Sequence, residues 1–355
     1  MGEAQRRGVN IGAMHRLKSS LPAEHPSSPA IGAEESAGES LRVALPQARS
    51  LALDLLKCVL ALAVVAIHSS PLAAVSAGLN SVLINGLCRI AVPTFFVING
   101  FYIAGALRDE ASFARYMRRM GSLYLFWMLV YAPFYIAPHG NSLLAILKTV
   151  VFGYLHLWYV AALLIAAPAL FVVHDKISSR SLAAVAGTLF GLGVAMQYGS
   201  YYSGGVQHYT LYRNAVFFGF PFLSIGYLVR VGFFAGLSEL WRRQLLVAGM
   251  LFLATEIAIA QTRDRIGSAF DMYASLILVC PLLLDKARQI GRKISRDDFS
   301  VVSSVIYFAH PWGIKITQRL VHQDVGAEVF LGSLLFCLAI AYPLKRLSLR
   351  WPFIL

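Results

Sequence analysis

Ten long apolar stretches constrain the fold of this chain more than any other feature of its sequence. They have about the length that a helix needs to cross the hydrocarbon core of a bilayer, roughly 17–25 residues. Transmembrane β-strands would instead be short segments of alternating polarity. The pattern therefore predicts an all-α, polytopic membrane protein with about ten transmembrane helices, near residues 51–70, 82–106, 120–138, 156–173, 181–197, 212–229, 244–261, 270–284, 301–318 and 326–344.

The composition excludes a water-soluble domain. Only 14% of the residues are charged, whereas 57% are hydrophobic, and soluble domains carry about 25% charged residues. The net charge of +13 does not indicate a nucleic-acid partner, because membrane proteins concentrate Lys and Arg in their cytoplasmic loops. With both termini in the cytoplasm, 18 Lys and Arg residues flank the spans on the inner side and 6 on the outer side, which favours this orientation.

Two segments differ from the spans. Residues 1–48 are rich in Ser, Ala, Gly, Pro and Glu and lack an apolar region of signal-peptide type. We expect them to form a disordered cytoplasmic tail without a catalytic role, followed by a transmembrane domain at 49–355. Residues 142–155 are apolar but short, and they predict an interfacial or re-entrant helix before the fourth span.

The four cysteines give no sign of a disulfide framework or a metal site. They lie within apolar runs, without a CxxC motif and without a histidine at metal-ligand spacing. Such cysteines are typical of small buried hydrophobic residues, and we expect no bound metal.

Charged and polar residues inside the first span are the strongest functional signal. A charge at mid-bilayer costs about 3 kcal/mol on insertion scales, so it faces protein or a water-filled cavity. Asp54, Lys57 and His68 all lie in this span. At about 100° per residue they share one helix face, and a rise of about 1.5 Å per residue separates Lys57 from His68 by roughly 16 Å. Two polar positions on one stripe favour a long ligand or a path across the membrane.

Each of these residues also has a simpler interpretation. Asp54 and Lys57 are three residues apart and can pair with each other, and the side chain of Lys57 can extend to the membrane surface. His68 can be an interfacial histidine that bonds to one neighbour.

More polar residues are expected at the depth of His68. Arg89 lies in the second span, which we expect Pro93 to break, and Glu256 and His310 lie in the seventh and ninth spans. Four polar groups at comparable depth indicate a polar chamber. Further candidate substrate-binding residues near this chamber are Asn99, His156, Trp158, Arg213, Asn214 and Tyr307. An aromatic belt at the membrane interface is the alternative explanation for the aromatic residues at 158 and 159. Taken alone, these residues favour an enzyme and a transporter about equally.

Six sequence blocks together resemble the acyltransferase family 3 of integral membrane proteins, which modify bacterial surface glycans. The blocks are LDLLKCVLALAVVAIH (53–68), VPTFFVINGFYIAG (92–105), ARYMRRMGSLYLFW (114–127), HLWYVAALL (156–164), YRNAVFFGFPFLSIGY (212–227) and IYFAHPWGI (306–314). Their number, order and spacing make the resemblance specific from about residue 49 onward. Two positions depart from the family: Lys57 stands where Arg is usual, and Asn99 stands where Ser is usual. Lys keeps the positive charge but lacks the planar two-pronged donor of Arg.

The resemblance implies what such a protein binds and where it acts. The co-substrate would be acyl-CoA, usually acetyl-CoA, and the acceptor a glycan or lipid-linked sugar, in the bacterial cytoplasmic (inner) membrane. Glycan-assembly proteins would be possible partners. Many relatives carry an esterase-like domain after the last span. The chain ends about ten residues past that span, so we expect a stand-alone member.

The resemblance also assigns roles to the polar residues. Lys57, Arg118 and Arg119 would bind the phosphates of CoA, and His68 would act as general base on the sugar hydroxyl. Asp54 or Glu256 would orient a neighbouring basic group. The tetrahedral oxyanion would be stabilised by Arg89, Asn99 or Tyr307.

Two other functions compete with acyl transfer. A transporter or flippase is the main alternative, because a polar chamber across a helix bundle also suits the passage of an acyl donor or a glycan. A structural subunit of a glycan-assembly complex is the second, in which intramembrane polar groups contribute helix–helix hydrogen bonds of about 0.6 kcal/mol each. Substitution of His68 separates the three: a transferase loses turnover, a transporter can retain flux, and a structural subunit changes little.

Overall fold

The computed structural model describes residues 50–139, 142–203, 209–262, 270–290 and 298–355, which belong to one compact unit, Ala48–Leu355. The expected tail at 1–48 lies outside the described residues. Within those residues the regular secondary structure is helical, as the sequence predicts. The first half contains α2 (Leu51–Ser69), α3 (Ala77–Ile84), η1 (Leu87–Ile90), α4 (Ala91–Ile103), α5 (Glu110–Val130), α6 (Ala132–Ile136), η2 (Ala137–His139), α7 (Leu143–Phe152), η3 (Leu155–Leu157) and α8 (Trp158–Val173).

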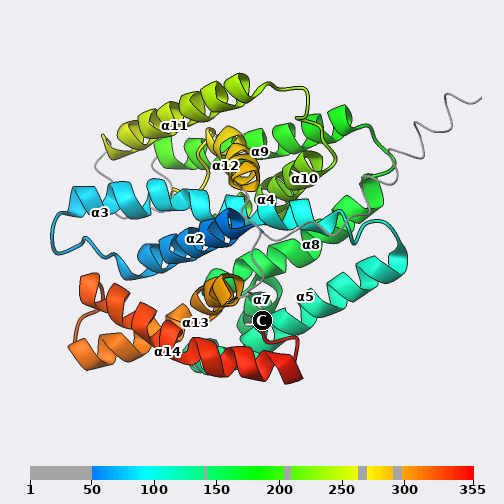
Figure 1. Ribbon diagram of the computed structural model, residues 1–355. Coiled ribbons are helices and arrows are strands. Elements are labelled where there is room, and N and C mark those ends of the chain that lie inside the picture. Colours follow the sequence, from blue (N-terminus) through cyan, green and yellow to red (C-terminus); the bar gives the residue numbers. More distant parts are fainter. Residues whose placement is uncertain (1–49, 140–141, 204–208, 263–269, 291–297) are drawn as a thin grey trace, which may run out of the picture. The chain divides into compact units, whose positions relative to one another are not determined.

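The second half continues with longer helices (Figure 1). They are α9 (Ser179–Tyr202), η4 (Tyr209–Leu211), the π-helical turn η5 (Ala215–Gly219), α10 (Phe220–Arg230), α11 (Glu239–Gln261), α12 (Leu276–Gln289), α13 (Asp298–Val321) and α14 (Ala327–Arg350).

Six helical segments among the described residues are long and apolar enough to cross a membrane. They are Leu51–Ser69, Ala77–Ile103, Leu155–Val173, Ser179–Tyr202, Glu239–Gln261 and Ala327–Arg350, and each overlaps an expected span. The part of the chain that the structure describes is therefore all-helical, with six helices suited to crossing a membrane. The other four expected spans, 120–138, 212–229, 270–284 and 301–318, also fall on helices, but these are shorter or more polar, so the number ten stays a prediction.

The helix at α7 agrees in position with the expected interfacial segment. None of its 10 residues is buried. At a rise of about 1.5 Å per residue the helix is about 15 Å long, which is half the thickness of the hydrocarbon core. Its place at the membrane interface stays a prediction.

Short polar side chains fix where several helices begin. A serine or aspartate just before the helix accepts a hydrogen bond from a backbone N–H in the first turn, which has no partner within the helix. These N-cap residues are Ser76, Asp109, Ser142, Ser178 and Ser238.

One expectation for the second span is wrong. Pro93 does not break the helix, because it lies in the first turn of α4, where a missing N–H costs no intrahelical hydrogen bond. The interruption lies earlier instead, at Asn85 and Gly86 between α3 and the 3₁₀ turn η1. It brings Arg89, within η1, to the place where the site is built.

Helix packing arranges α2, α4, α10, α13 and α14 around the site. The most extensive helix contacts are those of α13 with α14, α10 with α4, and α13 with α2, and Figure 1 shows α13 and α14 side by side. At the crossing of α4 and α10, Gly100 meets the backbone of Leu223 and Gly226 meets the backbone of Val97, so a Cβ atom on either glycine would collide with the other helix.

Two hydrogen bonds show which other elements lie at each end of α2. At the N-terminal end of α2, the Ser50 hydroxyl donates to the carbonyl of Ala287 in α12 at 3.3 Å. At its C-terminal end, the N–H of Gly326, just before α14, donates to the carbonyl of Ser69 at 2.8 Å. Lys57 therefore lies toward one end of the bundle and His68 toward the other.

Candidate functional site

A polar cavity of about 130 Å³ lies near the C-terminal end of α2; we call it the histidine cavity. Six residues predicted from the sequence line it, and a seventh, His310, contacts two of them. Those that line it are His68, Arg89, His156, Trp158, Arg213 and Tyr307, together with Asp271 and the apolar residues Val64, Ile67, Val92, Leu155 and Phe218. They come from helices far apart in the sequence, so the predicted convergence of polar residues is present in the structure.

Three histidines meet beside this cavity. The ring of His310 stacks on that of His68, with centroids 5.3 Å apart, and meets the ring of His156 edge-on at 4.9 Å. The Nδ1 atom of His310 lies 2.8 Å from the carbonyl oxygen of Tyr307. Because a carbonyl only accepts, Nδ1 donates and Nε2 carries the lone pair.

Several nitrogen atoms of this cluster have unmet hydrogen-bonding capacity. His310 Nε2 and both ring nitrogens of His156 are buried and have no hydrogen-bond partner among the described residues. Unpaired buried polar atoms cost free energy unless a ligand or water binds them. The cluster therefore suits a polar ligand rather than an apolar one.

An arginine–aspartate cluster forms another wall of the histidine cavity. Asp271 pairs with Arg89 through one carboxylate oxygen and with Arg213 through the other, at 3.1 Å for Arg213. The guanidinium of Arg213 also lies 5.1 Å from the ring centroid of Trp158. Two cations share one anion, so the wall keeps a net positive charge.

Arg89 retains donors for a ligand. Its Nε donates to the carbonyl of Ile84 at 2.9 Å, one Nη to Asn85 at 2.7 Å, and the other Nη to Asp271. An arginine has five N–H donors, so these three bonds do not exhaust it. By contrast, the other two oxyanion candidates each donate to protein groups: Tyr307 to the carbonyl of His156 at 2.9 Å, and Asn99 to Phe95 and Tyr159.

Asp271 is a site residue that the sequence analysis does not predict. It is a charged residue at the start of an expected span, which is the same signal that pointed to Arg89. Its backbone is held by a buried glutamine: the Oε1 atom of Gln197 in α9 accepts from the N–H groups of Asp271 and Met272 at 2.8 and 2.9 Å. Hydrogen bonds between a side chain and the backbone of a distant segment leave no local sequence pattern.

A second cavity of about 240 Å³ lies closer to the N-terminal end of α2; we call it the lysine cavity. Its polar lining residues are Lys57, Asn99, Tyr102, Arg119, Tyr159, Ser300, Ser303, Ser304 and Tyr307. Lys57 bonds to Asp54 at 3.0 Å, as the simpler interpretation of this pair expects, and its ammonium also lies 5.5 Å from the ring centroid of Tyr102. The pair and the cavity are therefore both present.

Tyr307 lines both cavities. Its ring meets those of Phe95 and Tyr159 at centroid distances of 5.5 and 5.7 Å. The two polar positions that the sequence predicts on one face of the first span thus lie in two cavities that share Tyr307 as a lining residue.

Five predicted site residues do not line either cavity. Asp54 pairs with Lys57, and His310 contacts the rings of His68 and His156. The other three are Arg118, Asn214 and Glu256. Arg118 is exposed on α5, although its neighbour Arg119 lines the lysine cavity. Asn214 caps the π-helical turn η5 by accepting from the N–H groups of Val216 and Phe217.

Glu256 does not orient a basic group in either cavity. It accepts from the hydroxyl of Tyr198 at 2.6 Å and from the N–H groups of Ala274 and Ser275 at 2.8 and 2.9 Å. It therefore positions the start of α12, and with it the segment that carries Asp271.

Comparison with known proteins identifies a domain over most of the chain. The model of the acyltransferase 3 family, described as an acyltransferase domain, matches residues 50–346. No solved structure matches the chain.

Three curated relatives share shorter stretches. Two are amino-acid racemases of Enterococcus faecalis. One is 33% identical over 129 residues, which cover 33% of this chain and 18% of the relative. The other is 29% identical over 195 residues, which cover 49% of this chain and 27% of the relative. A serine/alanine racemase of Enterococcus gallinarum is 25% identical over 260 residues, which cover 65% of this chain and 36% of the relative. The matched part thus spans about a fifth to a third of the length of these relatives.

Proposed function

The chain belongs to the acyltransferase 3 family, and on that premise we propose that it is an integral membrane O-acyltransferase. It would move an acyl group, most simply acetyl, from acyl-CoA to a hydroxyl of a sugar on a lipid-linked, exopolysaccharide or lipopolysaccharide glycan. The observation that carries the proposal is the pair of cavities that meet at Tyr307, one with a cluster of histidines and the other with Lys57 and Arg119.

The lysine cavity would hold the donor. Acyl-CoA is long and anionic, with its thioester far from its phosphates. Lys57 and Arg119 supply positive charge for those phosphates. The thioester would then lie toward Tyr307, which must move aside for it to reach the histidine cavity. We propose that the lysine cavity faces the cytoplasm, in agreement with the charge distribution of the loops.

The histidine cavity would hold the acceptor and carry out the chemistry. His68 takes the proton of the sugar hydroxyl while its oxygen attacks the thioester carbon. The C–S bond then breaks, and the proton passes to the CoA thiolate, so that an ester and free CoA leave. General-base catalysis of this kind contributes typically 10²–10⁴-fold. Arg89, which keeps unused donors, would stabilise the oxyanion.

The racemase relatives do not change this assignment. Their names describe whole proteins of which the match covers at most 36%, so we do not propose racemase activity for this chain. They do show that this type of segment also occurs in proteins named for another reaction. For that reason the experiment must distinguish transfer from passage of a ligand through the bundle.

Acyl transfer by the purified protein in nanodiscs tests the proposal. Labelled acetyl-CoA is supplied with and without a glycan extract from host cells, for the wild type, His68→Ala and Lys57→Ala. We expect His68→Ala to lose at least about 10²-fold in turnover with CoA binding intact. We expect Lys57→Ala to raise the KM for acetyl-CoA more than it lowers kcat.

The matched control is His322→Asn. His322 is exposed, beyond both cavities, at φ 56°, a backbone conformation that asparagine tolerates. This variant should transfer at the wild-type rate. A wild type that binds CoA without transferring or hydrolysing its acyl group would contradict the enzyme and favour a transporter. Mild effects of both alanine variants would favour a structural subunit.

A further inference from the structure

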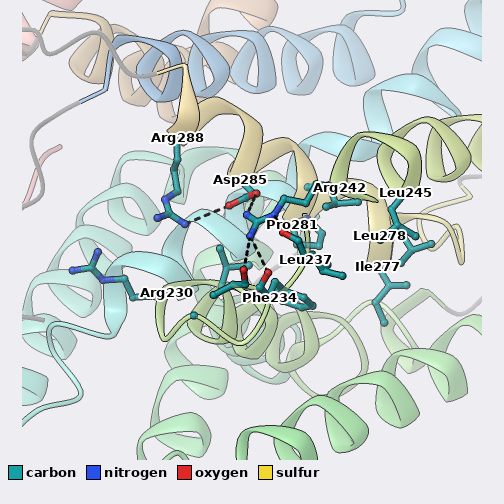
Figure 2. Close-up of a pocket in the computed structure, with 14 residues that line it drawn as sticks. Arg230, Phe234, Leu237, Arg242, Leu245, Ile277, Leu278, Pro281, Asp285 and Arg288 are labelled. Carbon is teal, nitrogen blue, oxygen red and sulfur yellow. Dashed lines mark hydrogen bonds and ion pairs between the residues drawn. The ribbon is translucent and has the colours of Figure 1, made fainter. Parts of the chain in front are cut away.

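A third cavity, of about 240 Å³, lies apart from the two described above, between the end of α10, the turn after it, α11 and α12 (Figure 2). We call it the arginine cavity. Arg230, Arg242, Arg288 and Asp285 supply its charges, so the lining contains three cations and one anion. It lies at the same end of the bundle as the lysine cavity, because α12 ends beside Ser50.

The three arginines have different surroundings. Arg242 is satisfied by protein groups: it pairs with Asp285 at 2.6 Å and donates to the carbonyls of Phe234 and Leu237, both at 2.9 Å, in the turn after α10. It holds that turn in place. Asp285 is therefore mostly occupied, and Arg288 approaches it only at 3.7 Å.

Arg230 and Arg288 form a cationic pair at one end of the cavity. Their guanidinium groups lie 5.2 and 4.3 Å from the ring centroid of the same residue, Phe101. The Nε of Arg288 is buried and has no hydrogen-bond partner among the described residues. Two like charges gathered on one ring, with an unused buried donor, suit an anion with several oxygen acceptors.

The other end of the cavity is apolar. Figure 2 shows Ile277, Leu278 and Leu245 on the side opposite Arg230 and Arg288, with Pro281 and Phe234 between the two ends. Leu278 lines the cavity and is also 40% exposed on α12. The apolar end is therefore open to the lipid that surrounds the bundle.

We propose that the arginine cavity is a binding site for an anionic phospholipid. The phosphate would bind to Arg230 and Arg288, and an acyl chain would lie along Leu278 and leave between α11 and α12 into the membrane. Charge complementarity selects an anionic headgroup, and the position of the apolar end selects a lipid rather than a soluble phosphate. A bound lipid would tie α10 to α12 at the end of the bundle where the lysine cavity lies.

Native mass spectrometry of the detergent-purified full chain tests this proposal. Phosphatidylglycerol and phosphatidylcholine with the same acyl chains are titrated separately. We expect the wild type to bind one phosphatidylglycerol at least tenfold more tightly than phosphatidylcholine. The double variant Arg230→Gln/Arg288→Gln should lose this preference. Leu278→Trp, which fills the apolar end and leaves the arginines intact, should weaken phosphatidylglycerol binding at least tenfold.

The matched control is Arg243→Gln, which removes an exposed arginine from the same helix as Arg242 without touching the cavity. It should bind like the wild type. Equal binding of the two lipids, or an equal loss in Arg243→Gln, would overturn the proposal and indicate only general surface charge. Displacement of the lipid by an equal concentration of inorganic phosphate, with Leu278→Trp unaffected, would also overturn it and indicate a phosphate site.

Discussion

At the residue scale, polar and charged side chains from distant helices converge on one cavity. His68, Arg89, His156, Arg213 and Tyr307 were all chosen from the sequence, and the structure brings them to one cavity. The reason is energetic: a polar side chain within an apolar span needs a protein or water partner, so such residues face each other. This reasoning predicts that a polar site exists within the bundle, but it does not predict which side chains pair with each other.

The two ion pairs that Asp271 forms with Arg89 and Arg213 give a prediction about stability. Asp271→Asn keeps the side-chain shape but removes the anion shared by Arg89 and Arg213. Removing one member of a buried ion pair costs about 3–5 kcal/mol. We expect a marked fall in the Tm of the detergent-solubilised protein, larger than that of Arg213→Gln, after which Asp271 still pairs with Arg89.

The control for this prediction is Asp324→Asn, at an exposed position between α13 and α14. Its Tm should equal that of the wild type. A Tm of Asp271→Asn within a degree of the control would mean that the cluster does not hold the segment in place.

The site residues that sequence reasoning missed or misplaced share one cause. Asp271 and Gln197 interact through a contact between α9 and a loop some seventy residues later, which no local spacing reveals. Glu256 has the same signal as Arg89, a charge inside a span, yet it binds two backbone N–H groups of another segment. Burial of charge was predictable from the sequence, but the choice of partner depends on how the helices pack.

At the element scale, the crossing of α4 and α10 brings the two helix backbones close together at Gly100 and Gly226. Close approach of small residues is a common way for membrane helices to associate. We expect Gly226→Ala to cost about 1–3 kcal/mol, because its Cβ would collide with the carbonyl of Val97 on α4. The measurement is the Tm in detergent.

Gly187→Ala in α9 is the matched control, because nothing lies within 4 Å of the added Cβ. It should be neutral or slightly stabilising, since alanine has the higher helix propensity. A Gly226→Ala protein as stable as Gly187→Ala would contradict the close crossing.

Helix type was easier to predict than helix boundaries. Long apolar runs left no alternative to helices, and six of the expected spans coincide with helices able to cross a membrane. The expected break at Pro93 was wrong, because proline is compatible with a first helical turn. What a proline does depends on its position in the helix, and the start of α4 was not visible in an uninterrupted apolar run.

At the scale of the whole molecule, the distribution of basic residues between the loops gives a prediction about topology. The turn between α8 and α9 carries Asp175, and the turn between α13 and α14 carries Asp324; both are exposed. In a background in which the four cysteines are replaced by alanine, Asp175→Cys should react with an impermeant maleimide only after the cells are opened. Asp324→Cys should react in intact cells.

The protein with its four cysteines replaced by alanine, and with no cysteine introduced, is the negative control for labelling. Reaction of both introduced cysteines from the same side would contradict the predicted topology, because the bias of basic residues predicts the first turn inside and the second outside.

Sidedness of the reaction is the most direct test of the central claim, that donor and acceptor bind in two cavities on either side of Tyr307. Proteoliposomes are loaded with labelled acetyl-CoA, and a glycan extract is added outside. We expect labelled glycan outside, free CoA retained inside, and neither with His68→Ala. Release of intact labelled acetyl-CoA, or labelling only when donor and glycan are on the same side, would contradict it.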